Sequence, residues 1–229
     1  MFRSRPRFKD RKDAGHKLAQ ALSGLEGSAP LILALPRGGV PVAFEVAKAL
    51  HAPLDVLLVR KIGAPGHEEY GIGAVVDGAN PQLILNEEIL AIVRPDPGYI
   101  EAEKHRQLAE IERRRGLYLG NRRPVPVAGR TVVLVDDGIA TGGTARVALK
   151  ALRQDQAARI VLAVPVAPPE TLDIVRDDAD EVVCLATPDP FLAVGAYYED
   201  FEQTTDSEVI GFLREAESFG RDSAARHAV

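Results

Sequence analysis

Short runs rich in Val, Leu and Ile recur along the chain, and their spacing constrains the fold more than any other feature of the sequence. Turn residues follow each run, and residues 40–51 and 143–154 place apolar side chains three and four positions apart, as an amphipathic helix requires. This alternation is typical of a parallel sheet that is buried on both faces. We therefore predict an α/β fold with three layers and right-handed crossovers. The predicted strands are residues 31–35, 55–60, 131–136, 159–166 and 181–186.

Two stretches of the sequence depart from this simple alternation. Residues 71–78 and 81–86 are apolar runs separated by a turn, and they predict a hairpin beside the main sheet. Residues 98–119 carry many Glu and Arg side chains and predict one long polar helix, which Pro124 and Pro126 end before the next strand. Such a helix is either a solvated face or an arm.

The composition is that of an ordinary globular protein, with 46% hydrophobic and 27% charged residues. The one cysteine, Cys184, excludes an internal disulfide, and its apolar surroundings favour a buried structural thiol over a nucleophile. No window reaches the roughly 18 apolar residues of a membrane span, so we expect a cytoplasmic protein without a membrane partner. The net charge of −5 argues against nucleic acid as a partner, although residues 1–17 are locally basic.

The segment TVVLVDDGIATGGTA, residues 131–145, is the most informative motif. A buried strand ends in the adjacent carboxylates Asp136 and Asp137, and a turn rich in Gly and Thr then opens a helix. In an open parallel sheet, such a turn exposes backbone N–H groups beside the positive end of the helix dipole, where a phosphate binds. The carboxylates can accept hydrogen bonds from ribose hydroxyls and suit Mg²⁺. The turn is not a Walker loop, because no Lys follows its glycines, and the dinucleotide pattern G-x-G-x-x-G is absent here.

This motif resembles the signature of the type I phosphoribosyltransferase family, in which four hydrophobic residues, two acidic residues and a Thr-Gly turn follow one another. The resemblance implies that Asp136 and Asp137 hold the ribose diol of 5-phosphoribosyl 1-pyrophosphate, and that they bind Mg²⁺ directly or through water. It also implies that the turn holds the 5-phosphate. The residues of this turn are Ala140, Thr141, Gly142, Gly143 and Thr144.

Two further loops resemble parts of the same family. Arg37, Gly38 and Gly39 follow the first strand and look like the pyrophosphate loop, since glycines let backbone N–H groups face an anion. Arg60 and Lys61 end the second predicted strand, where family members place basic residues near the leaving pyrophosphate. Lys61 is the preferred contact of the two. The catalytic residues that the resemblance implies are Asp136, Asp137 and Lys61.

Residues 188–201 resemble the hood that purine-type members of the family fold over the base. In one interpretation Phe191 stacks on the base, and the backbone near Val194 and Gly195 reads its edge. In the other, the aromatic residues of this segment form the core of the hood. The sequence does not decide between the two.

The fold that the resemblance implies is a three-layer, Rossmann-like parallel sheet of the type I phosphoribosyltransferase kind, with a small hood and an inserted helical arm. One domain is expected over residues 1–229. The loop that closes over the reaction corresponds either to residues 64–70 or to the Arg-rich residues 113–123. A dimer contact is the alternative role for residues 113–123. The expected parts of the domain are a core of about 30–186, a helical insertion of about 86–125, and a hood of about 187–202 followed by a C-terminal helix.

The implied function is Mg²⁺-dependent transfer of 5-phosphoribosyl to a nucleobase-like nitrogen acceptor with release of pyrophosphate, as in nucleoside salvage. The alternatives are a regulatory protein that senses 5-phosphoribosyl 1-pyrophosphate without catalysis, and an enzyme with a non-base acceptor. Ala140 stands where 6-oxopurine members carry an acidic residue, so this loop looks more like the adenine type. The habit of the family also favours a homodimer.

Overall fold

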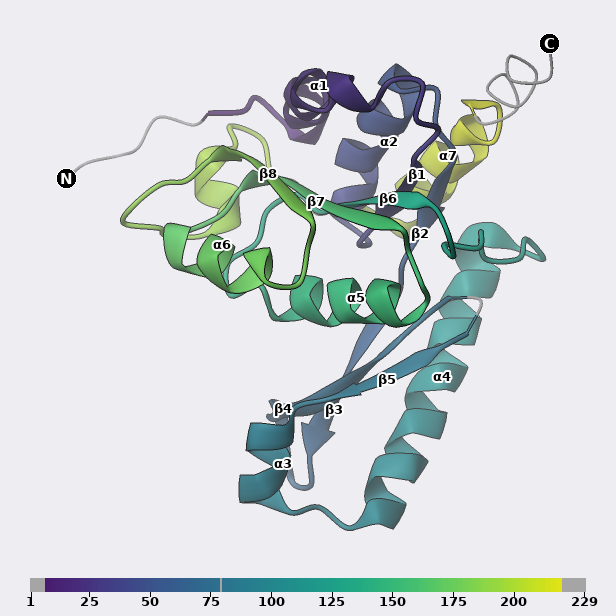
Figure 1. The fold of residues 1–229 in the computed structure, drawn as a ribbon, viewed down its shortest axis with the longest axis vertical. Coiled ribbons are helices and arrows are strands. Elements are labelled where there is room, and N and C mark those ends of the chain that lie inside the picture. The colour runs from purple at the N-terminus through teal and green to yellow at the C-terminus, as the bar shows by residue number, and fades with distance from the viewer. Residues whose placement is uncertain (1–6, 79, 220–229) are drawn as a thin grey trace.

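Two sheets organise the chain (Figure 1) in the computed structural model, which describes residues 7–78 and 80–219. The larger sheet has five parallel strands in the order β2-β1-β6-β7-β8, and it confirms the predicted α/β fold. The predicted domain bounds and the basic residues 1–17 extend beyond the described part of the chain. The strands are β1 (Leu31–Ala34), β2 (Leu54–Val56), β6 (Thr131–Val135), β7 (Arg159–Val166) and β8 (Glu181–Ala186).

Helices cover both faces of the larger sheet, as the amphipathic patterns predict: α1, α2 and α7 lie on one face, and α5 and α6 lie on the other (Figure 1). Alternate strand residues fill two separate cores. Ile32 and Val133 face the first core, whereas Leu33 and Leu134 face the second. These helices are α1 (Arg11–Ala21), which the 3-10 turn η1 (Ser23–Leu25) follows, α2 (Gly39–Ala49), α5 (Gly143–Gln154), α6 (Pro169–Arg176) and α7 (Asp206–Ala216).

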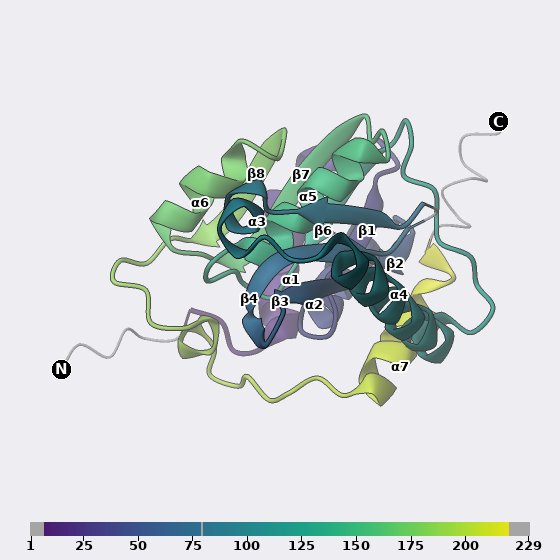
Figure 2. The ribbon, with the colours of Figure 1, turned by 90° about the horizontal axis from the view of Figure 1, so that it is seen from below.

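The smaller sheet is antiparallel, and α4 and α5 lie against it, as the view from below shows (Figure 2). Its strands are β3 (Val59–Ala64), β4 (His67–Val76) and β5 (Gln82–Leu85), in that order. The hairpin predicted from residues 71–78 and 81–86 is present as β4 and β5. It pairs with β3 in this separate sheet rather than with the main sheet.

The predicted strand at residues 55–60 is wrong in one respect, because the run is divided between the two sheets. The N–H of Leu57 still bonds to the carbonyl of Ala34 in the main sheet. The carbonyl of Leu58 instead accepts the N–H of Asp77, which directly follows β4. Leu57 and Leu58 are both 4% exposed, so the apolar run continues through the crossing and leaves no break in the sequence pattern.

The long polar helix predicted at residues 98–119 is present as α4 (Pro97–Leu119), and the short helix α3 (Glu87–Val93) precedes it. One stripe of α4 is buried although it carries polar side chains, among them Glu103, Gln107 and Arg115. Gln107 donates to Glu103 at 2.5 Å within this stripe.

Across the described residues, no helix has both the length and the apolar character needed to cross a membrane.

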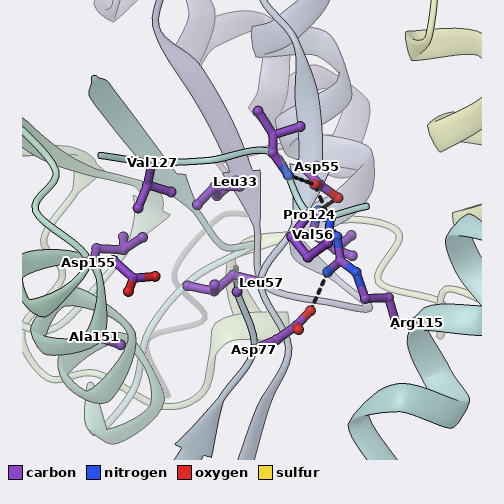
Figure 3. A pocket seen from close by; sticks show the side chains of 13 residues that line it. Leu33, Asp55, Val56, Leu57, Asp77, Arg115, Pro124, Val127, Ala151 and Asp155 are labelled. Atoms are coloured by element: carbon purple, nitrogen blue, oxygen red, sulfur yellow. Dashed lines mark hydrogen bonds and ion pairs between the residues drawn. The ribbon is translucent and has the colours of Figure 1, made fainter. Parts of the chain in front are cut away.

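A buried group of charges joins α4 to both sheets and lines a small pocket (Figure 3). Arg115 of α4 binds Asp77, and its Nη2 lies 3.3 Å from Oδ2 of Asp55 in β2. The same Asp55 oxygen accepts the N–H of Val125 at 3.0 Å. Burial raises the pKa of Asp77, while the guanidinium of Arg115 acts in the opposite direction. These contacts attach α4, the predicted helical arm, to both sheets.

Candidate functional site

The candidate site forms where the loops after β1 and β6 meet at the carboxyl end of the main sheet. Asp136 and Asp137 follow β6, and Gly38 and Gly39 follow β1. A Cβ on Gly38 would lie 2.0 Å from Oδ2 of Asp137, and a Cβ on Gly39 would lie 2.8 Å from the carbonyl oxygen of Val135. The close approach therefore requires glycine at both positions. The structure brings the predicted pyrophosphate loop and the predicted ribose carboxylates into contact.

The two carboxylates have different environments. Oδ1 of Asp136 accepts the N–H of Asp137 at 2.9 Å. Asp136 keeps some surface open to solvent, but burial, followed by the neighbouring charge of Asp137, raises the pKa of Asp136 well above its usual value. Asp136 therefore holds a proton more readily than a solvated carboxylate does.

Arg11, at the start of α1, supplies a counter-charge to Asp137. Its Nε and Nη2 each lie 2.8 Å from Oδ2 of Asp137. The hydroxyl of Tyr198 donates to the backbone carbonyl of Asp137 at 2.6 Å. Sequence patterns do not reveal either contact, because Tyr198 is one of several aromatic residues in the segment expected to form the hood, and Arg11 is one of several cations in a basic segment.

The turn between β6 and α5 is shaped by glycine and by a neighbouring helix. Gly142 caps α5 in a left-handed conformation, with φ 71°. The hydroxyl of Thr171, from α6, donates to the carbonyl of Ala140 at 2.5 Å and holds the turn. The N–H groups of Gly143 and Thr144 begin the helix and have no earlier helical carbonyl to bind. They are available to an anion beside the positive end of the helix dipole.

Arg60 and Lys61 extend from opposite faces of β3. Nε of Arg60 donates to Oε1 of Gln107 on α4 at 3.0 Å. Lys61 lines a pocket of about 500 Å³ together with Gly143 and Thr144 at the start of α5. The structure therefore places Lys61 in the pocket that borders the start of α5 and leaves Arg60 bonded to α4.

The remaining candidates make other contacts or lie in other elements. Arg37 approaches Asp206 of α7 at 3.7 Å. Residues 64–70 form the tip of the β3–β4 hairpin, and residues 113–123 form the C-terminal end of α4 and the chain that follows it. Cys184 lies in β8, where burial raises the pKa of its thiol and lowers its reactivity.

The hood segment packs against residues near the start of the described chain. Phe8 forms an isolated bridge with Tyr198, and the centres of their rings are 5.3 Å apart. Phe191 packs on Tyr197 with ring centres 5.5 Å apart, and Tyr197 is 1% exposed. Tyr197 and Tyr198 are therefore hood core, whereas Phe191 is only partly buried.

The hood covers the loop that follows β6. Val194 and Gly195 lie in a 3-10 turn, η2 (Val194–Tyr197). A Cβ on Gly138 would lie 2.6 Å from Cγ1 of Val194, so glycine at this position lets the hood approach the acidic pair. The structure thus places Val194, which is predicted to lie near a base, beside the residue that follows the predicted ribose carboxylates.

The acidic pair also suits a shared magnesium ion. Asp136 and Asp137 provide the carboxylate oxygens that Mg²⁺ prefers. Among residues 7–78 and 80–219, no group of three or more His, Cys, Asp or Glu side chains could hold a metal on its own. A Mg²⁺ ion here would complete its shell with phosphate and water oxygens, which is its usual mode beside a phosphorylated substrate. The residues present fit that mode.

Comparison with known proteins identifies the family of this chain. The family model described as phosphoribosyl transferase domain matches residues 7–202. Proteins from two strains of Mycobacterium tuberculosis, provisionally named phosphoribosyl transferases, are 47% identical over 222 residues. This match covers 97% of the chain but 49% of each relative, so the chain spans about half the length of the curated relatives it matches.

A solved structure agrees with the match in sequence. The crystal structure of TT1426 from Thermus thermophilus is 47% identical to this chain and superposes with a TM-score of 0.80. The similarity covers 91% of this chain and 98% of that chain. Because the domain match spans both loops and the acidic pair, the chain belongs to the phosphoribosyl transferase domain family.

Proposed function

We propose that this chain transfers the 5-phosphoribosyl group from 5-phosphoribosyl 1-pyrophosphate to a nucleobase-like nitrogen acceptor and releases pyrophosphate. The contact between Gly38 and Asp137 is the observation that supports this most directly. In this substrate the pyrophosphate and the ribose hydroxyls lie on neighbouring carbons. A protein that binds both needs its pyrophosphate loop and its ribose carboxylates side by side.

Each part of the site has a role in this proposal. The N–H groups at the start of α5 hold the 5-phosphate, and Asp136 and Asp137 accept hydrogen bonds from the ribose hydroxyls. The backbone of residues 37–39 holds the pyrophosphate, and Lys61 adds positive charge beside the phosphates. Mg²⁺, when bound through Asp136 and Asp137, offsets the negative charge of the pyrophosphate.

The reaction balances without a further reagent. The bond between C1 of the ribose and the pyrophosphate oxygen breaks, and its electron pair stays on the pyrophosphate. The acceptor nitrogen forms the new bond to C1 and releases a proton to water. Positive charge develops on the sugar ring, so fixed carboxylates near the ring and cations near the leaving group both favour the transition state.

The hood and the phosphate turn support an adenine-like acceptor. Phe191 has an incompletely buried ring that can stack on a base, and the backbone of Val194 and Gly195 lies beside the same loop. Ala140 replaces the acidic residue of the 6-oxopurine type, which favours an adenine-like acceptor over hypoxanthine or guanine. Homodimer assembly and a cytoplasmic location remain predictions, and the single thiol of Cys184 fits a reducing compartment.

Calorimetric titration with 5-phosphoribosyl 1-pyrophosphate and Mg²⁺, followed by a panel of bases and a pyrophosphate-release assay, tests the proposal. Release with one base supports transfer and identifies the acceptor. Binding without release for any base favours the sensing alternative or an acceptor outside the panel. Absence of binding by the wild type would show that the proposal is wrong.

A pair of double variants tests the assignment of the site. Asp136→Asn with Asp137→Asn should abolish binding of 5-phosphoribosyl 1-pyrophosphate and leave the fold intact, as judged by circular dichroism. Asp173→Asn with Asp177→Asn removes two exposed carboxylates of the α6 region and should leave binding unchanged. Equal affinity in the two double variants would overturn the site assignment.

A further inference from the structure

Arg11 is the first residue of α1, yet its side chain is turned into the site. Only 12% of the side chain is exposed. Nε and Nη2 both bind Oδ2 of Asp137, and Nη1 donates to the backbone carbonyl of Glu202 at 2.6 Å. The guanidinium carbon also lies 3.9 Å from the ring centre of Phe201. All three guanidinium nitrogens of Arg11 therefore have a partner.

The partners of Arg11 belong to two different parts of the site. Asp137 is one of the two ribose carboxylates, whereas Phe201 and Glu202 belong to the hood. A guanidinium is planar and its donors point in fixed directions, so one side chain sets the orientation of the carboxylate relative to the hood. The backbone of Gly38 approaches the same Oδ2 atom. The Asp137 carboxylate is thus in contact with both a cation and a glycine backbone.

The charge of Arg11 matters as well as its shape. Asp136 and Asp137 are adjacent in sequence, and negative charges this close repel each other. A guanidinium that is largely shielded from solvent offsets this repulsion more effectively than a solvated cation does. Lysine at this position would keep the charge but not the paired donors or the planar stacking on Phe201.

We propose that Arg11 is a positioning residue for ribose recognition, which holds the Asp137 carboxylate ready for the ribose hydroxyls and links it to the hood. The inference rests on the proposed function, because it assumes that the acidic pair binds a ribose diol. A carboxylate that is already held in place loses less freedom when ligand binds, and affinity rises accordingly.

Binding of three ligands to Arg11→Gln separates this role from a general loss of structure. With Mg²⁺ present, the variant should bind ribose 5-phosphate and 5-phosphoribosyl 1-pyrophosphate about tenfold more weakly, equivalent to about 1.4 kcal/mol. Inorganic pyrophosphate, which lacks a ribose, should bind as it does to the wild type. Arg11→Lys should recover part of the loss. Unchanged or tighter ribose binding would overturn the inference and would indicate that Arg11 competes with the ligand.

Lys17→Gln is the matched control. Lys17 is also a cation of α1 that lies near an aromatic ring, at 5.3 Å from the centre of Phe8, and it pairs with Asp13. It does not contact Asp137. The control variant should bind all three ligands as the wild type does, and a loss equal to that of Arg11→Gln would show that any weakening of α1 suffices.

A double-mutant cycle tests whether Arg11 acts through Asp137. In an Asp137→Asn background, Arg11→Gln should cause little further loss of ribose 5-phosphate affinity, because the carboxylate that Arg11 positions is already gone. Additive losses would overturn the positioning role. If the wild type binds none of the three ligands, the proposed function is wrong. That result differs from additive losses, which require a wild type that binds.

Hydrogen exchange without ligand tests the link to the hood separately. Arg11→Gln and Asp137→Asn should both speed amide exchange in residues 197–202. Lys48→Gln, which alters a cation of α2 that lies 5.7 Å from the centre of the Phe44 ring, should not. Unchanged exchange in both site variants would overturn the link, whether or not the protein binds a phosphoribosyl ligand.

Discussion

The Cα of Gly38 lies against the carboxylate of Asp137, so closely that a Cβ on Gly38 would fall 2.0 Å from Oδ2. We predict that Gly38→Ala abolishes binding of 5-phosphoribosyl 1-pyrophosphate, because the added methyl must displace the whole Asp137 carboxylate from its place beside the pyrophosphate loop. Isothermal titration with Mg²⁺ measures the effect. Gly24→Ala is the control, since a Cβ there meets nothing within 4 Å. Wild-type affinity in Gly38→Ala would contradict the role given to this contact.

The two basic residues of β3 should behave differently. Lys61→Met should weaken binding of 5-phosphoribosyl 1-pyrophosphate with little change in stability, because Lys61 faces the start of α5 across a pocket. Arg60→Met should lower stability by about 1 kcal/mol and leave ligand affinity nearly unchanged, because it loses the hydrogen bond to Gln107. Titration and urea unfolding of both variants check this contrast. The reverse pattern would show that Arg60, and not Lys61, contacts the pyrophosphate.

The buried ion pairs of Arg115 should contribute strongly to the free energy of unfolding. Arg115→Met leaves Asp55 and Asp77 without their cation in a buried site, and we expect a loss of about 3–5 kcal/mol in the free energy of unfolding. Arg114→Met, on the same helix, breaks a pair with Glu110 near the surface and should change that free energy little. Urea unfolding compares the two. Similar losses would mean that the buried group does not fix α4.

The same group should make stability depend on pH in a specific direction. Burial raises the pKa of Asp77 above the ordinary 3.8, so the folded protein takes up this proton at a higher pH than the unfolded chain does. Protonation of Asp77 therefore favours the folded state as pH falls from the folded pKa towards 3.8. Relative to Asp77→Asn, the wild type should gain stability over that window and show a constant difference above it. Urea unfolding of both proteins at a series of pH values tests this, and a gain on raising the pH would contradict it.

Much of the main sheet could be predicted from sequence because its strands are buried on both faces. Such strands read as continuous apolar runs, and residues 131–135 and 159–166 are examples. The same property hid the division of residues 55–60. Leu57 and Leu58 are buried while the chain passes from one sheet to the other, so hydrophobicity alone cannot mark the crossing.

The acidic pair and the phosphate turn could be predicted because their residues are adjacent in the sequence. Asp136, Asp137 and the following turn lie in one continuous segment, and glycine marks the places where backbones approach. Arg11 was not predictable in this way, because it stands 126 residues before the carboxylate that it binds. A basic segment reads the same in sequence whether its cations face water or a buried carboxylate.

The bonds of Arg11 also bear on the order in which the protein can assemble. During synthesis Arg11 emerges early, but Glu202, which accepts its third donor, follows 191 residues later. A nascent chain that has reached the end of β7 already contains both anion loops, yet it lacks the segment that holds Arg11 from the hood side. Contacts between such distant residues form late in folding because of their large loop-closure cost. The ribose carboxylate therefore acquires its final setting only when nearly the whole domain has left the ribosome.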